Sequence, residues 1–157
     1  GDVRRKDQWV KRRKGTFDRV LVDAPCSGVG SWRRKPDARR TWGYSKATNG
    51  GGDCEGKQRL EELLPFQQFI LRRASKLVKP GGRLVYVTCS LLPQENEDQL
   101  RAFLKSDEGT DWDITPPSSS EFPVPFTAGP GGSSYLRLSP YQHGTDGFFA
   151  AVLTRQL

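Results

Sequence analysis

Two short hydrophobic runs, each followed at once by a cysteine-containing loop, limit the folds open to this chain. The runs are residues 17–22 (FDRVLV) and 83–88 (RLVYVT), and the loops begin at Asp23-Ala24-Pro25-Cys26 and Cys89-Ser90. β-rich runs that end in turn residues are typical of buried strands. Because an amphipathic helical pattern over residues 57–78 joins them, the sequence predicts a strand–helix–strand unit with parallel strands.

Prolines and glycines predict where the helices begin and end. Pro65 lies inside the helical pattern, so we expect a break there and a second helix from Pro65. Lys79-Pro80-Gly81-Gly82 predicts a helix stop and a turn. Pro93 is expected to open another helix, and Glu95 and Glu97 in its first turn suit the helix dipole.

The rest of the chain adds strands but few parallel ones. A short strand is expected within residues 111–115, and two more at 135–139 and 148–154. The fold class is therefore α/β, with an antiparallel return at the end and too few parallel strands for a complete doubly wound sheet. Segments expected to lack regular structure are a basic connector at 1–16 and flexible loops at 43–56 and 116–134.

Length and charge bound the class of protein. The chain has 157 residues, one domain or part of one, and it starts with Gly and contains no Met, so we expect a piece of a longer chain. Its net charge is +7, and residues 1–40 hold 13 Lys/Arg against 5 Asp/Glu. Such clustering indicates a polyanionic partner or, alternatively, a solvated basic surface. No run resembles a membrane span or a signal peptide.

Cysteine and histidine usage argues against a metal site. The three cysteines, Cys26, Cys54 and Cys89, form no Cys-x-x-Cys pair, and His143 is the single histidine. We therefore expect no structural zinc and no disulfide framework, but reduced thiols in an intracellular protein. Cys54, in a Gly-rich stretch, is expected to be a surface thiol without a role.

Two of these cysteines follow the two strands directly, where open α/β sheets bind their ligands. If the strands are neighbours, Cys26 and Cys89 can flank one planar ring, with Asp23 at the same rim, although two small buried side chains would explain them as well. A nearby helix N-terminus would favour the Cys89 thiolate. Two thiols and a carboxylate suit methylation at carbon 5 of cytosine: one thiolate adds to carbon 6, and a second thiol assists the elimination.

The surroundings of both cysteines resemble the RsmB/Nop/Sun family of RNA cytosine-5 methyltransferases, and the likeness runs from about residue 15 to 157. Six segments carry it: Asp23-Ala24-Pro25-Cys26-Ser27-Gly28, Trp32-Arg33-Arg34-Lys35-Pro36-Asp37, Lys79-Pro80-Gly81-Gly82, Thr88-Cys89-Ser90, Leu92-Pro93-Gln94-Glu95-Asn96 and Asp146-Gly147-Phe148-Phe149-Ala150.

This resemblance implies a Rossmann-like class I methyltransferase sheet, S-adenosyl-L-methionine as cofactor, and rRNA or tRNA as substrate. It implies that Cys89 is the covalent nucleophile, that Cys26 is linked to product release, and that Asp23 contacts the cofactor. Arg33 and Arg34 would face RNA phosphate, or else form a surface salt-bridge pair. The expected location is cytoplasmic in a bacterium, and nuclear, nucleolar or organellar in a eukaryote.

One departure from the family pattern limits what this chain can do alone. The family's cofactor loop lies upstream of the Asp-Ala-Pro-Cys motif, and the 22 residues before Asp23 contain no such loop. We therefore expect the C-terminal half of a catalytic domain, inactive in isolation, with one exposed sheet edge prone to aggregation. The alternatives are a Cys–His hydrolase using His143, a non-catalytic RNA-binding module, and a fragment without independent function.

Overall fold

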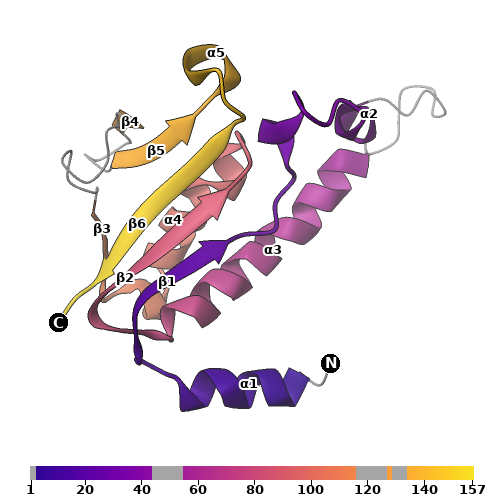
Figure 1. The fold of residues 1–157 in the computed structure, drawn as a ribbon. Helices are drawn as coiled ribbons and strands as arrows, with labels where there is room; N and C mark the ends of the chain where they lie inside the picture. The colour runs from indigo at the N-terminus through magenta and orange to yellow at the C-terminus, as the bar shows by residue number, and fades with distance from the viewer. Residues whose placement is uncertain (1–2, 44–54, 116–126, 129–133) are drawn as a thin grey trace.

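The computed structural model describes residues 3–43, 55–115, 127–128 and 134–157 (Figure 1). Its α-helices are α1 (Val3–Arg12), α2 (Ala38–Gly43), α3 (Glu55–Ser75), α4 (Glu97–Leu104) and α5 (Pro140–His143). Its strands are β1 (Phe17–Asp23), β2 (Val78–Thr88), β3 (Trp112–Ile114), β4 (Thr127–Ala128), β5 (Ser134–Leu138) and β6 (Phe148–Arg155). Short 3-10 turns are η1 (Val29–Ser31), η2 (Pro93–Glu95) and η3 (Asp107–Gly109).

The strands form one sheet in the order β1-β2-β6-β5-β4, and β3 pairs with the far end of β6. The predicted α/β class and the antiparallel C-terminal strand are confirmed, since β1 and β2 are parallel and β6 runs antiparallel to β2. In the described part, parallel pairing is limited to β1 and β2, because β3 and β5 join β6 in the antiparallel sense.

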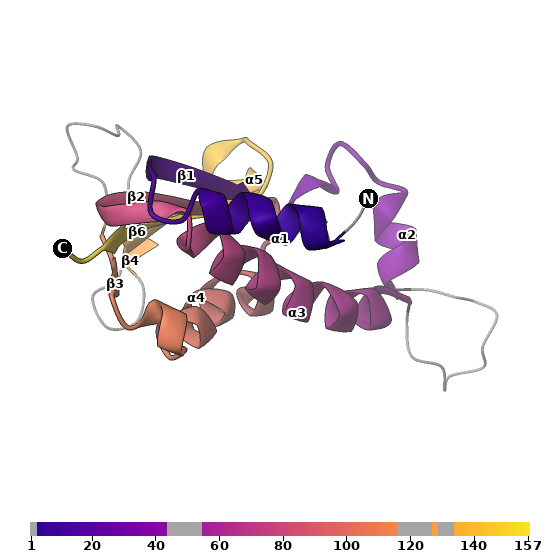
Figure 2. The ribbon, with the colours of Figure 1, turned by 90° about the horizontal axis from the view of Figure 1, so that it is seen from below.

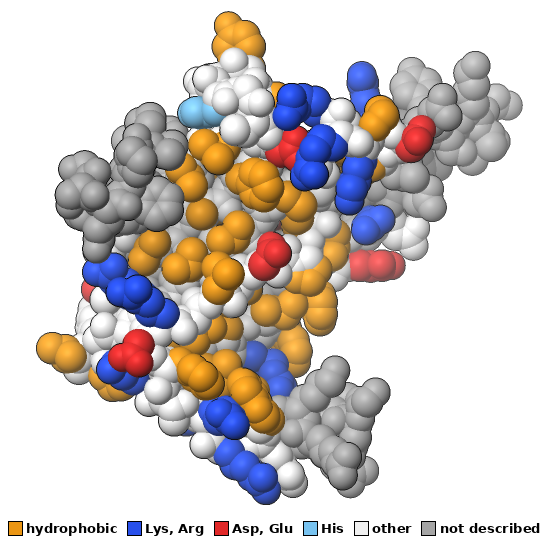
Figure 3. Space-filling model, viewed as in Figure 1, with side chains coloured by type: hydrophobic (Ala, Val, Ile, Leu, Met, Phe, Trp, Pro, Cys, Tyr) orange, Lys and Arg blue, Asp and Glu red, His pale blue; other side chains and the backbone are white. Residues whose placement is uncertain are grey.

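Helices α3 and α4 cover one face of this sheet (Figure 2). Alternate strand residues point into that layer, so Leu84, Tyr86 and Leu153 are fully buried against Leu71 of α3 and Phe103 of α4. The side chains between them in the strands are only half-buried. Figure 3 shows the second face of the sheet, where apolar side chains gather at its centre. The described residues therefore form two layers, and β1 pairs with a described strand on one side only.

The N-terminal segment differs from the expected connector, because residues 3–12 form helix α1. Lysine, arginine and glutamine favour helix, but residues 3–12 contain too few apolar residues for a helical periodicity to predict α1. The ring of Trp9 stacks on Phe17 of β1 with centroids 6.4 Å apart, which joins the helix to the sheet. Residues 44–54, with Cys54, and most of the predicted loop at 116–134 lie outside the described residues.

The expected break at Pro65 is wrong: α3 runs through it without interruption. Pro65 is exposed while Gln67 and Leu71 are buried, so packing of the opposite side of the helix outweighs the missing N–H. Lys79-Pro80-Gly81-Gly82 belongs to β2, but Asp18 alone stands opposite these four residues, so they bulge from the pairing. Pro93 opens the 3-10 turn η2, and α4 starts at Glu97.

Among the helices of the described residues, none combines the length and the apolar character that crossing a membrane requires.

Pro65→Ala is expected to stabilise the protein, because it restores an N–H donor inside α3 and removes the ring from the path of the preceding turn. The gain should be up to about 3 kcal/mol in the free energy of unfolding, measured by urea denaturation. Glu62→Ala, at an exposed position of the same helix, is the control and should change stability by less than about 0.5 kcal/mol. A less stable Pro65→Ala variant would contradict this account of α3.

Candidate active site

The thiols of Cys26 and Cys89 are in contact, with 3.2 Å between their sulfur atoms. The parallel register places Asp23 opposite Val87, and the N–H of Ala24 donates to the Val87 carbonyl at 2.9 Å, so both strands end at the same level. The sulfur atoms are too far apart for a disulfide, whose bond is about 2.05 Å long, and both cysteines are free. The structure thus brings together the two cysteines that follow the strands.

Contact between the thiols makes them unequal. The hydrogen bond from Cys26 is the main cause that lowers the pKa of Cys89 to about 7, against the opposing effects of burial and of the nearby charges of Asp23 and Glu95. The same hydrogen bond, followed by burial, raises the pKa of Cys26 well above its ordinary value. Cys89 is therefore the thiolate of the pair and Cys26 the neutral donor. The neighbouring thiol, rather than the expected helix N-terminus, is the main cause.

Asp23 is the last residue of β1, and its side chain is exposed at the rim of the site. Its carboxylate is close enough to act on the charge of Cys89. An exposed carboxylate at the carboxyl end of a parallel strand suits a cationic or hydrogen-donating ligand.

Close backbone packing fixes the loop that carries Cys26. The N–H of Gly30 donates to the Cys89 carbonyl at 3.0 Å, and the Gly30 carbonyl accepts from the N–H of Gly147 at 2.8 Å. A β-carbon on Gly30 would lie 2.2 Å from the Gly147 oxygen, so no side chain fits there. Gly30 therefore joins the β1 loop, the β2 loop and the start of β6.

A buried carboxylate that the sequence analysis missed lies behind the same loop. Glu95 is fully buried. Its Oε1 accepts the N–H of Ser27 at 2.7 Å and the side-chain N–H of Gln67 at 3.0 Å, and its Oε2 accepts the Ser27 hydroxyl. The Gln67 amide also donates to the Pro25 carbonyl at 2.9 Å. The sequence analysis placed Glu95 in the first turn of a helix for its negative charge, and only the fold reveals these distant partners.

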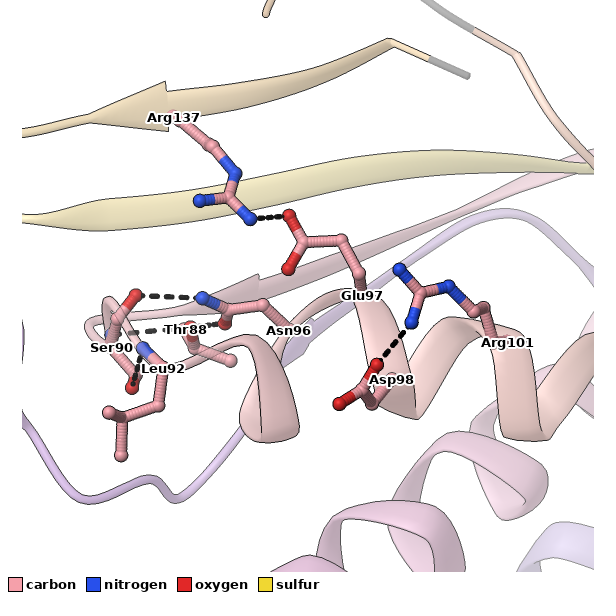
Figure 4. Close-up of polar contacts among 8 residues, drawn as sticks. All are labelled: Thr88, Ser90, Leu92, Asn96, Glu97, Asp98, Arg101 and Arg137. Atoms are coloured by element: carbon pink, nitrogen blue, oxygen red, sulfur yellow. Dashed lines mark hydrogen bonds and ion pairs between the residues drawn. The ribbon is translucent and has the colours of Figure 1, made fainter. Parts of the chain in front are cut away.

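Asn96 holds the other cysteine loop (Figure 4). Its Oδ1 accepts the Thr88 hydroxyl at 2.5 Å, and its Nδ2 donates to the Ser90 carbonyl at 3.0 Å. The residues on both sides of Cys89 are thus bonded to one buried amide. The hydroxyl of Ser90 in turn accepts the N–H of Leu92 at 3.1 Å and lies 3.4 Å from the Ser27 hydroxyl.

Arg33 and Arg34 lie next to Asp146 rather than free in solvent. Nε of Arg34 donates to the buried Asp146 carboxylate, and Nε of Arg33 lies 3.7 Å from it. Both arginine side chains nevertheless stay more than half exposed, at 57% and 63%. The ion pairs that the sequence analysis considered as an alternative are present, and the guanidinium groups keep exposed N–H donors.

His143 has a local role in the described structure. It ends the short helix α5, and its Nδ1 accepts the N–H of Ser139 at 3.1 Å. That nitrogen therefore belongs to a turn contact, which weakens the case for a Cys–His hydrolase. Within the described ranges, no cluster of three His, Cys, Asp or Glu side chains could hold a metal ion.

Replacing Cys26 is expected to make Cys89 less reactive at neutral pH. Cys26→Ala removes the thiol that donates to Cys89, so the Cys89 pKa rises from about 7 and alkylation shifts to higher pH. Iodoacetamide labelling, followed peptide by peptide with mass spectrometry from about pH 5 to about pH 10, measures the midpoint on both sides of the ordinary thiol pKa. Cys26→Ser keeps a hydroxyl donor and should shift the midpoint less. Equal midpoints in all three proteins would contradict the proposed origin of the shift.

Gly30→Ala is expected to cost about 3 kcal/mol or more in the free energy of unfolding, because the new methyl group meets backbone atoms of two other segments. Gly15→Ala is the matched control: Gly15 has φ +65° but open space around it, so the loss should be only about 1 kcal/mol. Denaturation of both variants measures the difference. Similar losses would show that backbone crowding at Gly30 is unimportant.

Known proteins resemble this chain in sequence and in fold. The profile of the family described as 16S rRNA methyltransferase RsmB/F matches residues 1–154. Ribosomal RNA small subunit methyltransferase B from Shewanella oneidensis is 36% identical over 155 residues, 99% of this chain and 30% of the relative. The probable ribosomal RNA small subunit methyltransferase B from Synechocystis is 41% identical over 151 residues, 93% of this chain and 29% of the relative.

Two crystal structures from Pyrococcus horikoshii share the fold. A methyltransferase homolog protein has a TM-score of 0.60 and 29% identity, with 88% of this chain and 39% of that chain covered. NSun6, solved with SFG, has a TM-score of 0.55 and 25% identity, with 86% of this chain and 29% of that chain covered. This chain spans about 30% of the length of the curated relatives. Its sheet is Rossmann-like, and the chain belongs to the RsmB/F methyltransferase family.

Proposed function

We propose that this chain carries the cysteine-bearing half of a catalytic domain that transfers a methyl group from S-adenosyl-L-methionine to carbon 5 of cytosine in small-subunit ribosomal RNA. The observation that carries the proposal is the 3.2 Å contact between two unequal thiols at the ends of adjacent parallel strands. Membership of the RsmB/F family and the names of the relatives support rRNA as the substrate class.

Cys89 is the nucleophile in this proposal, because its pKa is the lowered one. Its thiolate adds to carbon 6 of the cytosine ring, and the electron pair of the 5,6 double bond moves onto carbon 5, where it is shared with the rest of the ring. Carbon 5 thereby becomes nucleophilic and would take the methyl group that S-adenosyl-L-methionine supplies, whose methyl–sulfur bond would break to leave S-adenosyl-L-homocysteine.

Release of the product needs the proton on carbon 5 to leave. Removal of that proton re-forms the 5,6 double bond and expels Cys89 as thiolate. The main cause of the raised pKa of Cys26 is the hydrogen bond to Cys89, and that interaction ends once the Cys89 sulfur is bound to carbon. Cys26, which is only partly buried, can then lose its proton to solvent and act as the base at this stage. The contact between the two thiols would therefore make addition by Cys89 come before proton removal by Cys26.

Among the described residues, Asp23 is the one whose chemistry fits the cofactor. Its exposed carboxylate, at the rim beside Cys89, can accept a hydrogen bond from a bound donor group. Gly28 and Gly30 do not form a cofactor loop, since backbone atoms of Cys89 and Gly147 occupy the space beside Gly30. When bound, S-adenosyl-L-methionine supplies the electrophilic methyl group. NSun6 was solved with SFG, an analogue of this cofactor, which supports its use in the family.

Arg33 and Arg34 are proposed to contact RNA phosphate. Asp146 orients both guanidinium groups, and their exposed N–H donors remain available to a phosphate oxygen. Because Gly30 links their segment to both cysteine loops, a phosphate bound here would lie beside the nucleotide that enters the site.

The full-length protein containing these residues should separate the roles of the two cysteines. With small-subunit rRNA and S-adenosyl-L-methionine, Cys26→Ala is expected to accumulate a covalent protein–RNA adduct, because elimination stalls. Cys89→Ala should form no adduct and transfer no methyl group. Denaturing gels detect the adduct, and mapping of 5-methylcytosine measures the product.

Three outcomes would contradict the proposal. An adduct that survives in Cys89→Ala would overturn the assignment of roles. Unchanged methylation after replacement of both cysteines by serine would overturn the chemistry, and unchanged RNA binding with no methylation in any variant would favour a non-catalytic RNA-binding module.

A further inference from the structure

Glu95 is a buried acid that the proposed chemistry does not use. Its side chain is fully buried in the 3-10 turn between β2 and α4. Burial of a carboxylate is costly unless donors satisfy it, and the donors found among the described residues are uncharged: the Ser27 N–H, the Ser27 hydroxyl and the Gln67 amide. A cost of this kind is repaid when the group sets a geometry that the site needs.

All three donors act on the loop that carries Cys26. Two belong to Ser27, the next residue, and the third belongs to Gln67, whose amide also donates to the carbonyl of Pro25 on the other side of Cys26. The loop is therefore held immediately before and after its cysteine. The backbone of Glu95 is itself fixed, since its carbonyl accepts the Tyr86 hydroxyl of β2 at 2.8 Å.

The next residue does the same for the other loop. Asn96 is bonded to Thr88 and Ser90, which flank Cys89. One short turn thus positions both thiols, through Glu95 for Cys26 and through Asn96 for Cys89.

We infer that Glu95 is a positioning residue that keeps Cys26 in place for product release, whereas Asn96 keeps Cys89 in place for adduct formation. The inference rests on the proposed function. It predicts that loss of Glu95 affects elimination more than addition, although Glu95 touches no reacting atom. Misplacement of a reacting group by about 1 Å can slow a step about a hundredfold.

The test compares full-length variants with small-subunit rRNA and S-adenosyl-L-methionine. Glu95→Ala removes the acceptors of the Cys26 loop, so the adduct should form and accumulate, with release slowed up to about a hundredfold. Glu95→Gln is the conservative variant: its oxygen can accept from the Ser27 and Gln67 N–H groups, and its amide can donate to the Ser27 hydroxyl. It should restore release to within about threefold of wild type.

Asn96→Ala is the matched control at the neighbouring position. It should slow formation of the adduct, and the adduct should not accumulate. A general loss of stability in the turn would instead affect Asn96→Ala and Glu95→Ala in the same way. Thermal unfolding of each variant checks that the fold survives. If Glu95→Ala does not fold, Ser27→Ala removes one of the three donors and should still raise the adduct level several-fold above wild type.

The inference is overturned if Glu95→Ala, or Ser27→Ala in its place, releases product at the wild-type rate. It is also overturned if Glu95→Gln stalls as Glu95→Ala does, because the charge rather than the position would then matter. The adduct in Cys26→Ala distinguishes failure of the proposed function from failure of the inference. If Cys26→Ala forms no adduct, the proposed function is refuted. If Cys26→Ala accumulates the adduct but the Glu95 variant does not, the inference alone is refuted.

Discussion

The in-register parallel pairing of β1 with β2 is the constraint on which the site depends. Because Asp23 lies opposite Val87, the chain leaves both strands at the same edge and at nearly the same level. Side chains alternate along a strand, so a slip by one residue would turn Val22 out of the core and move one cysteine loop relative to the other. The contact between the thiols is thus a consequence of strand register.

Register alone would leave two flexible loops, and buried polar groups make them rigid. Glu95 and Asn96 come from one turn. Glu95 accepts hydrogen bonds from Ser27 beside Cys26, and Asn96 bonds to the Thr88 hydroxyl and the Ser90 carbonyl on either side of Cys89. Gly30 adds one backbone hydrogen bond to Cys89 and another to Gly147. Such networks stabilise a unique arrangement only when their members are satisfied, so this small volume is more sensitive to substitution than its size suggests.

The sequence could predict what depends on neighbours in the chain. The strands that end at Asp23 and Thr88 follow from their β-rich composition, and the approach of Cys26 and Cys89 follows from parallel pairing. The continuous α3 could not be predicted, because buried residues beyond Pro65 override its local effect. The partners of Glu95 come from the Cys26 loop and from α3, both far away in the chain, so nothing near Glu95 distinguished a buried acceptor from a surface carboxylate.

Among the described strands, β6 comes last in the sequence but lies inside the sheet, between β2 and β5. During synthesis, β2 therefore waits with one edge unpaired until the ribosome has made residues 148–155. Contacts between segments so far apart form slowly, and unpaired edges favour association with other chains. Until β6 is in place, the unpaired edge of β2 is the part of the described sheet at which protection by chaperones matters most.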